Sequence, residues 1–142
     1  MSELFSLRPA REEDLDYINT YTFTEGMDKV PSLDNITVAA NDEDQVVGFI
    51  RIVIGANGAA HVNPIITVST WRGYGVGRAL MEDALEKYGE LRLVSRGSSV
   101  GFYKTLGYGE ISWNDIDKLV VDDCDHCEAF DECKPLPMGK VL

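Results

Sequence analysis

The sequence has few basic residues and no long apolar run. It carries 13 Lys and Arg against 24 Asp and Glu, which gives a net charge of −11. Binding along a nucleic-acid backbone needs clustered basic side chains, so the charge argues against a nucleic-acid partner. A cationic or neutral partner fits better, although an acidic surface can also serve solubility alone. No apolar stretch approaches the roughly 18–20 residues that span a bilayer, so we expect no membrane partner.

Cysteines are also few, and all three lie near the C-terminus, at Cys124, Cys127 and Cys133. The N-terminus is charged early and has no signal-peptide core, so an odd cysteine count does not indicate a disulfide framework. We therefore expect a cytoplasmic protein. The spacing C-x2-C-x5-C, with His126 inside the first pair, offers ligands for zinc. His126 is awkwardly placed for one tetrahedron, and the surrounding carboxylates disfavour thiolates. We predict no metal site, and a metal or redox role of the tail stays an alternative.

What the sequence does contain indicates one globular domain. A chain of 142 residues with 44% hydrophobic content can bury a core, so we predict a single domain over residues 1–142, with 122–142 as an acidic tail. Consecutive strands come first and strand–helix alternation follows, which indicates an α/β (α+β) class. Strands are predicted at 4–8, 36–42, 45–55, 59–69 and 90–95, and closing strands at 108–113 and 117–122. Helices are predicted at 9–22, with Pro9 at the entry, at 75–88 and at 98–107.

The stretch WRGYGVGR (residues 71–78) joins an expected strand to an expected helix. The first four N–H groups of a helix have no partner within it, and the helix dipole adds positive charge there. Glycines at alternate positions let the backbone approach a ligand, so the loop is suited to phosphate. The spacing matches neither the dinucleotide pattern G-x-G-x-x-G nor a P-loop. The alternative is a turn whose glycines serve backbone geometry alone.

Two motifs in register resemble those of the GCN5-related N-acetyltransferases (GNAT). RGYGVG (residues 72–77) resembles motif A, R/Q-x-x-G-x-G/A, between a strand and a helix. FYKTLGY (residues 102–108) resembles the end of motif B, F-Y-x-x-L-G-F/Y. The opening LRPAREEDLDYI (residues 7–18) resembles the first strand and helix of the family. The resemblance covers roughly residues 4–113.

The resemblance implies a mixed, mostly antiparallel, splayed sheet flanked by helices, with acetyl-CoA as co-substrate. By the match to motif A, the backbone of the loop holds the CoA pyrophosphate; that cradle comprises Arg72, Gly73, Tyr74, Gly75, Val76, Gly77 and Arg78. The edge of the preceding strand, at Ile66, Thr67 and Val68, pairs with the pantetheine arm. Arg96 stands where the family often has a cofactor-contacting Asn. Arg96 either contacts CoA or is a solvated loop residue.

Two residues are candidates for catalysis. Tyr103 stands at the family's position for the acid that protonates the leaving thiolate, and a tyrosine is protonated at neutral pH. Its alternative role is to pack the helix on the sheet. The strand before the loop lacks the carboxylate that often serves as base. His61 is the titratable candidate on that strand, and its alternative is a hydrogen-bonded structural histidine. Glu25, Asp28 or bulk water are further candidates for the base.

The predicted function is therefore acetyl-CoA-dependent N-acetyl transfer, directly from the thioester to a primary amine of a small molecule, peptide or protein. The acidic balance weakly favours a cationic acceptor. The alternative from another class is a non-catalytic CoA-binding module of the same fold. Dimers are common in the family, and the sequence leaves a homodimer open.

Overall fold

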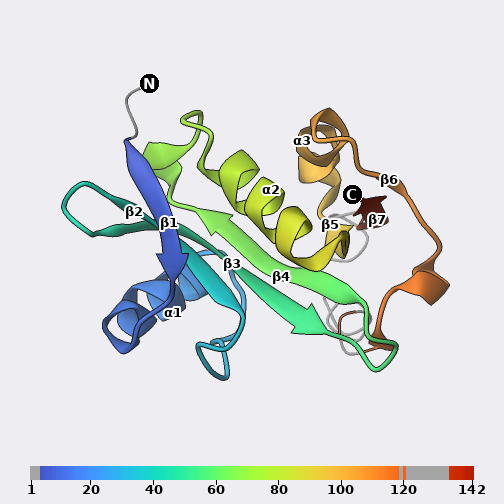
Figure 1. Cartoon of the computed structure of the whole chain (residues 1–142), viewed down its shortest axis with the longest axis horizontal. Coiled ribbons are helices and arrows are strands. Elements are labelled where there is room, and N and C mark those ends of the chain that lie inside the picture. The colour runs from blue at the N-terminus through green and yellow to red at the C-terminus, as the bar shows by residue number, and fades with distance from the viewer. Residues whose placement is uncertain (1–3, 119, 121–134) are drawn as a thin grey trace. The chain divides into compact units, whose positions relative to one another are not determined.

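The computed structural model describes residues 4–118, 120 and 135–142, drawn in colour in Figure 1. These residues form a seven-stranded sheet with the strand order β1-β2-β3-β4-β5-β7-β6. The pairs β1–β2, β2–β3, β5–β7 and β6–β7 are antiparallel, whereas β4 and β5 run parallel. The predicted α+β class with a mixed, mostly antiparallel sheet is confirmed. The strands are β1 Phe5–Pro9, β2 Ile36–Asn41, β3 Val46–Ile54, β4 Ala60–Thr67, β5 Glu90–Ser95, β6 Gly109–Glu110 and β7 Leu136–Val141.

The helices lie close to the predicted positions. They are α1 Leu15–Thr24, α2 Val76–Tyr88 and α3 Val100–Thr105, with 3-10 turns at Glu12–Asp14, Ser69–Trp71, Gly97–Ser99 and Trp113–Asp115. In the part of the chain that is described, no helix combines the length and the apolar character needed to cross a membrane. The chain packs as two compact units. The first comprises the residues up to Arg51 together with Pro64–Asp83, and the second comprises Ile52–Asn63 together with the residues from Ala84 onward.

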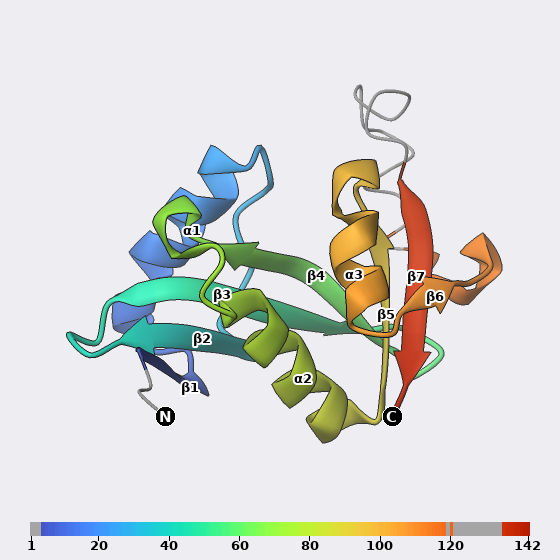
Figure 2. The ribbon, with the colours of Figure 1, turned by 90° about the horizontal axis from the view of Figure 1, so that it is seen from above.

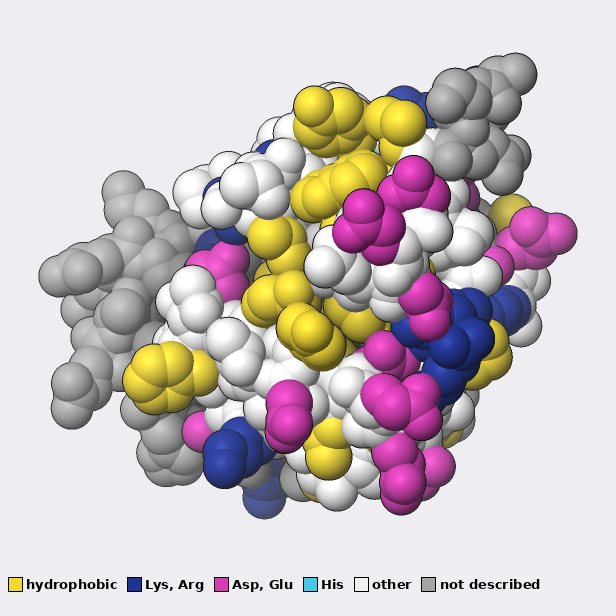
Figure 3. All heavy atoms as spheres, turned by 90° about the vertical axis from the view of Figure 1, so that its left-hand side faces the viewer, with side chains coloured by type: hydrophobic (Ala, Val, Ile, Leu, Met, Phe, Trp, Pro, Cys, Tyr) yellow, Lys and Arg dark blue, Asp and Glu magenta, His cyan; other side chains and the backbone are white. Residues whose placement is uncertain are grey.

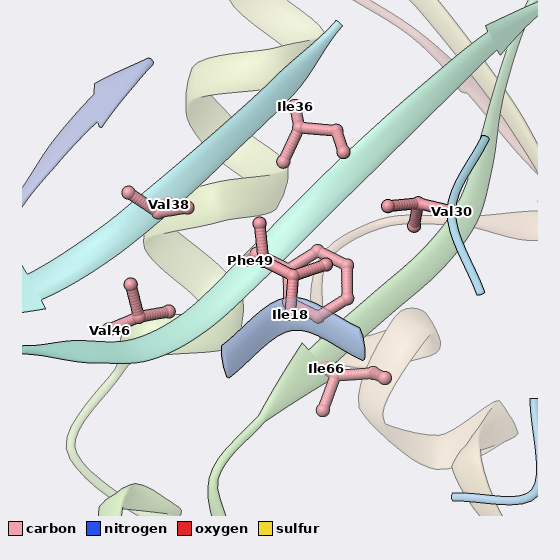
Figure 4. Close-up of a cluster of buried hydrophobic side chains, with 7 residues drawn as sticks. All are labelled: Ile18, Val30, Ile36, Val38, Val46, Phe49 and Ile66. Carbon is pink, nitrogen blue, oxygen red and sulfur yellow. The ribbon is translucent and has the colours of Figure 1, made fainter. Parts of the chain in front are cut away.

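The core of the first unit lies between α1 and the strands β2 and β3. Alternate residues of a strand point to opposite faces, and Val38 and Phe49 share the face that Ile18 of α1 covers. All three side chains are fully buried, and each contributes roughly 1.5–3 kcal/mol relative to exposure. Figure 4 shows the cluster around them, which comprises Ile18, Val30, Ile36, Val38, Val46, Phe49 and Ile66.

The opposite face of β3 receives the first turn of α2. Gly48 precedes Phe49 and therefore faces the other way; a Cβ built on Gly48 would stand 2.8 Å from Cγ1 of Val76, the first residue of α2. α1 and the start of α2 thus cover opposite faces of β3, as Figure 2 shows. The missing side chain at Gly48 lets the helix that follows the glycine loop lie directly on the strand.

In the second unit, β7 lies between β5 and β6. Its register with β5 runs from Glu90 opposite Val141 to Ser95 opposite Leu136. Met138 of β7 is fully buried, as are its β5 neighbours Leu91 and Leu93. The C-terminal segment is therefore part of the sheet core of this unit.

Two predictions for the ends of the chain are corrected by the structure. Pro9 is the last residue of β1, opposite Thr37 of β2, and not the entry to a helix. The helical region begins with the turn Glu12–Asp14, because Arg8 and the Arg11 N–H both bind the Asp14 carboxylate at its start.

The closing strands also differ from the prediction. Only Gly109–Glu110 of the predicted strand 108–113 is a strand, and Lys118 and Val120 of the predicted strand 117–122 are helical. The sheet is instead completed by β7. Pro137 obscured this strand in the sequence, because proline cannot donate to a ladder. Its carbonyl nevertheless accepts from the Ile111 N–H at 3.0 Å.

Candidate active site

The glycine loop of the first unit turns sharply from β4 into α2. Gly73 and Gly75 have φ values of +87° and +83°, a left-handed conformation that residues with a Cβ rarely adopt. The helix begins at Val76, and its first helical hydrogen bond runs from the Ala79 N–H to the Gly75 carbonyl at 3.0 Å. Alternating left- and right-handed residues turn successive N–H groups toward one side, which forms an anion-binding concavity.

Six consecutive amides of this loop have no acceptor among the described residues. The Arg72 N–H donates to the Ser69 carbonyl at 3.3 Å, and the next intramolecular donor is Ala79. Between them, the N–H groups of residues 73–78 donate to no acceptor within the described residues. The N-terminus of α2 adds its partial positive charge at this place. The chemistry of this donor set fits a pyrophosphate, and it supports the anion site that the sequence predicts.

The two arginines of the loop each pair with a carboxylate. Arg72 Nη2 lies 3.0 Å from Glu25 Oε1, next to the end of α1, and Arg78 Nε lies 2.9 Å from Glu82 Oε1 one helical turn on. The aromatic residues of the loop contact each other: the rings of Trp71 and Tyr74 lie 5.3 Å apart and are tilted by 51°. Tyr74 is mostly exposed, so this pair flanks the loop without burying it.

The backbone groups of Ile66, Thr67 and Val68, the three predicted pantetheine contacts at the end of β4, differ in whether they already have partners. The Val68 N–H donates to the Val47 carbonyl at 2.9 Å, and the Val68 carbonyl accepts from the Trp71 N–H at 2.8 Å. Ile66 is buried in the core, and its carbonyl lies against Gly48 of β3. Because backbone groups of alternate residues face the same neighbour, those of Thr67 point to the other edge of β4. Thr67 is therefore the best placed of the three for an extended ligand.

In the second unit, α3 buries the predicted acid. Tyr103 is buried, and its ring contacts Phe102 and Tyr108 edge-on at centroid distances of 5.1 and 6.1 Å. Burial raises the pKa of Tyr103 to about 12, and the positive charge of Arg96 opposes part of that rise. The phenol is therefore fully protonated at neutral pH. The side chain both packs α3 and carries a proton.

His61 adopts the structural role that was its alternative. The ring is completely buried in the second unit. Its Nδ1 lies 3.0 Å from the Ala59 carbonyl, and its Nε2 accepts the Asp117 N–H at 3.0 Å. The arrangement assigns the proton to Nδ1 and occupies the lone pair of Nε2 with a backbone donor. Because a base needs a free lone pair near its substrate, the geometry favours the structural role over the predicted catalytic one.

Comparison with known proteins agrees with these features. Residues 7–120 match the family model described as "Acetyltransferase (GNAT) domain". This chain belongs to the GNAT acetyltransferase family. A GNAT domain uses acetyl-CoA as co-substrate, and the chain is accordingly an acetyltransferase.

Two relatives are named as N-acetyltransferases, and a solved structure shares the fold. The peptidyl-lysine N-acetyltransferase YjaB of Escherichia coli is 34% identical over 85 residues, which cover 58% of this chain and 54% of that enzyme. The uncharacterized N-acetyltransferase CT2212 of Chlorobaculum tepidum is 27% identical and is covered over 96% of both chains. Rv2747 of Mycobacterium tuberculosis, solved in complex with CoA, has the same fold with a TM-score of 0.77 at 17% identity, covering 96% of this chain and 99% of that one.

The remaining predictions for this GNAT domain concern Arg96 and the tail. Arg96 is exposed beside α3, and its charge acts on Tyr103, so a cofactor contact stays a prediction. The three cysteines and His126 lie outside the described residues, and the prediction about metal in the tail is untested. Within the described ranges, no group of three His, Cys, Asp or Glu could hold a metal ion.

Sequence reasoning missed one feature of the loop. Glu25 entered only as a candidate base, and its ion pair with Arg72 joins residues 47 positions apart. Neither a motif nor a periodic pattern indicates such a pair. The sequence shows that Glu25 is acidic and follows a predicted helix, but this does not identify Arg72 as its partner.

Proposed function

We propose that this protein transfers an acetyl group directly from acetyl-CoA to a primary amine of a small molecule, peptide or protein. The observation that carries the proposal is the run of six amides, residues 73–78, that have no protein acceptor within the described residues. Such a run at the start of a 13-residue helix supports binding of the CoA pyrophosphate.

The loop side chains add to this binding in the proposed complex. Arg72 and Arg78 supply charge-assisted contacts to phosphate oxygens, and both side chains are largely exposed. Thr67 offers its backbone groups to the pantetheine amides, because they face away from β3. Arg96 contributes positive charge near Tyr103.

Tyr103 is the proposed proton donor to the CoA sulfur. When the amine attacks the thioester carbonyl, the C–S bond breaks and the sulfur leaves as a thiolate. The thiolate takes up the phenolic proton, and solvent then returns a proton to the tyrosine. The raised pKa of Tyr103, about 12, keeps the phenol protonated at neutral pH.

An ammonium acceptor must lose a proton before it can attack, and this proton needs a different acceptor. His61 is not retained for this step, because both ring nitrogens are occupied by backbone groups. Glu25 and water remain candidates for the base. Asp28, three residues further along the chain, is the third candidate. Glu25 lies at the end of α1 and is partly exposed.

The proposed acceptor is an amine on a flexible, cationic molecule. The net charge of −11 favours cationic acceptors. The relative YjaB is named for peptidyl-lysine acetylation, so lysine-containing peptides are the first acceptors to test, followed by small amines.

Thioester consumption with a panel of lysine peptides, polyamines and other small amines tests the proposal. Tyr103→Phe should lower kcat by roughly 10²-fold or more while the affinity for CoA is kept, because general acid catalysis contributes about 10²–10⁴-fold. Tyr88→Phe, at the exposed end of α2, is the matched control and should be unchanged.

Two outcomes would contradict the proposal. An unchanged rate in Tyr103→Phe would remove the acid role. Tight CoA binding without turnover of any amine in the panel would contradict N-acetyl transfer to these acceptors.

A further inference from the structure

The ion pair between Arg72 and Glu25 places a carboxylate beside the anion-binding loop. The two side chains meet at 3.0 Å within the first unit, and they are 61% and 30% exposed. Arg72 immediately precedes residues 73–78, whose six amides have no acceptor in the described part of the chain. A negative side chain therefore stands next to the place where a pyrophosphate is expected to bind.

The position of Glu25 is unfavourable for the helix that carries it. Glu25 caps the C-terminus of α1, and the last turn of α1 contains no basic residue. The C-terminal end of a helix dipole is negative, so a carboxylate there costs stability unless a cation is near. Arg72 supplies such a cation, and the pair links α1 to the glycine loop.

The loop does not need Glu25 to keep its shape. The Arg72 N–H donates to the Ser69 carbonyl, and the Trp71 N–H donates to the Val68 carbonyl at 2.8 Å. These backbone bonds hold the turn before the glycines. Glu25 contacts the end of the Arg72 side chain, and an exposed pair of this kind exchanges partners at little cost.

We propose that Glu25 competes with the CoA pyrophosphate for the Arg72 guanidinium and thereby lowers the affinity of the enzyme for CoA. In the free protein the carboxylate neutralises Arg72. When CoA binds, the phosphate oxygens and the carboxylate share one guanidinium, and the two anions repel each other. The inference rests on the proposed pyrophosphate site at residues 73–78.

The direction in which one substitution changes the CoA affinity separates competition by Glu25 from the opposite role. If Glu25 competes, Glu25→Gln tightens CoA binding; if Glu25 orients Arg72 toward the phosphate, the same change weakens it. An exposed ion pair contributes about 0.2–1 kcal/mol, so the expected gain is about 1.4- to fivefold in Kd at low salt. The gain should shrink as added salt screens the charges.

The Kd for CoA is measured by calorimetric titration. A rate measurement would not separate the two roles, because Glu25 is also a candidate base. Four proteins form a cycle: wild type, Glu25→Gln, Arg72→Gln and the double variant. The tightening should appear with Arg72 present and disappear in the Arg72→Gln background. Glu13→Gln, an exposed residue of the turn Glu12–Asp14, removes the same charge away from the loop and should leave Kd unchanged.

Weaker or unchanged binding in Glu25→Gln would overturn the competition while the wild type still binds CoA. Equal tightening in Glu13→Gln would also overturn it, since the effect would then follow net charge. A wild type that does not bind CoA would overturn the pyrophosphate site itself, and the competition with it.

Discussion

At the scale of single residues, three tyrosines with the same hydroxyl experience different environments. The Tyr21 hydroxyl donates to the Val46 carbonyl at 2.8 Å. The Tyr108 hydroxyl is buried without a hydrogen-bond partner among the described residues. Burial raises the pKa of Tyr103 and of Tyr108 to about 12. Both residues therefore favour the folded state below about pH 10, and this contribution is lost between about pH 10 and 12.

Removal of the hydroxyl should change the stability in opposite directions at Tyr108 and at Tyr21. Tyr108→Phe should stabilise the protein by about 1–2 kcal/mol, because it removes a buried hydroxyl that has lost its water. Tyr21→Phe should destabilise it by about 1 kcal/mol, because it leaves the Val46 carbonyl without that donor. Urea unfolding at pH 7 measures both. A loss of stability in Tyr108→Phe would mean that its hydroxyl has a partner.

At the scale of elements, the position of α2 depends on the absence of a side chain at Gly48. A Cβ there would stand 2.8 Å from Val76 Cγ1 and 3.0 Å from the Ile66 carbonyl. Valine is stiff at its first torsion and the carbonyl belongs to the backbone, so neither can move away cheaply. Because Val76 directly follows Gly75, a shift of α2 also displaces the amides of the loop.

We therefore expect Gly48→Ala to cost about 1–3 kcal/mol of stability and to weaken CoA binding. Gly101→Ala is the matched control, because a Cβ on this α3 residue meets no atom within 4 Å. That change should be neutral or stabilise by up to about 1 kcal/mol. Thermal unfolding with and without CoA measures both properties. Normal stability and CoA affinity in Gly48→Ala would show that α2 can adjust.

The N-terminal elements are joined by a network of ion pairs. Arg8 of β1 binds Asp14 at 2.7 Å and Asp44 of the β2–β3 turn at 3.0 Å. The Arg11 N–H also donates to the Asp14 carboxylate. The Arg8 guanidinium holds the pKa of Asp14 below its usual range, against the opposing effect of burial. The folded state thus favours the ionised carboxylate.

Asp14→Asn should lower the stability by about 2 kcal/mol at pH 7. A depressed pKa contributes stability above the unfolded value, near 3.9, and the contribution is lost as the pH falls below it. The difference between wild type and variant should therefore shrink as the pH is lowered from about 5 toward 2. Denaturant unfolding across this range tests it. A difference that does not change with pH would contradict the electrostatic explanation.

At the scale of the whole molecule, negative charge dominates. Acidic side chains are spread over the face shown in Figure 3, whereas basic ones gather in a few places. A net charge of −11 produces a field that attracts cations and repels the anionic cofactor. In the proposed complex the glycine loop counters this repulsion locally, because its amides would lie close to the ligand and long-range charges are screened by salt.

The field predicts that the activity toward a cationic acceptor depends on salt more strongly than the activity toward a neutral one. For a lysine-rich peptide, kcat/KM should fall by roughly tenfold as the ionic strength rises from about 0.01 to 0.3 M, since steering is screened. A neutral amine of similar size should change little. Steady-state kinetics at saturating acetyl-CoA measure both. Equal salt dependence for both acceptors would show that the charge serves solubility rather than recognition.

Much of the fold could be predicted because its signals are local. The apolar runs of 36–42 and 45–55, the acidic turn between them and the glycine loop before the helix each lie within a few residues. The end of the chain could not be predicted in the same way. Pro137 hides β7 from local patterns, and the strand exists because Met138 packs beside Leu91 and Leu93, over 40 positions away.

The sequence by itself determined the family, the acetyl-CoA chemistry and the loop that is proposed to meet the cofactor, because a glycine loop at a helix N-terminus acts through its own backbone. Only the tertiary structure decided which side chains are free to act. His61 and Tyr103 both read as catalytic in the sequence; burial against Ala59 and Asp117 occupies His61, whereas Tyr103 keeps its proton. The partner of Arg72 was likewise decided by folding, since hydrogen bonds and charges between distant residues depend on the packing that brings them together.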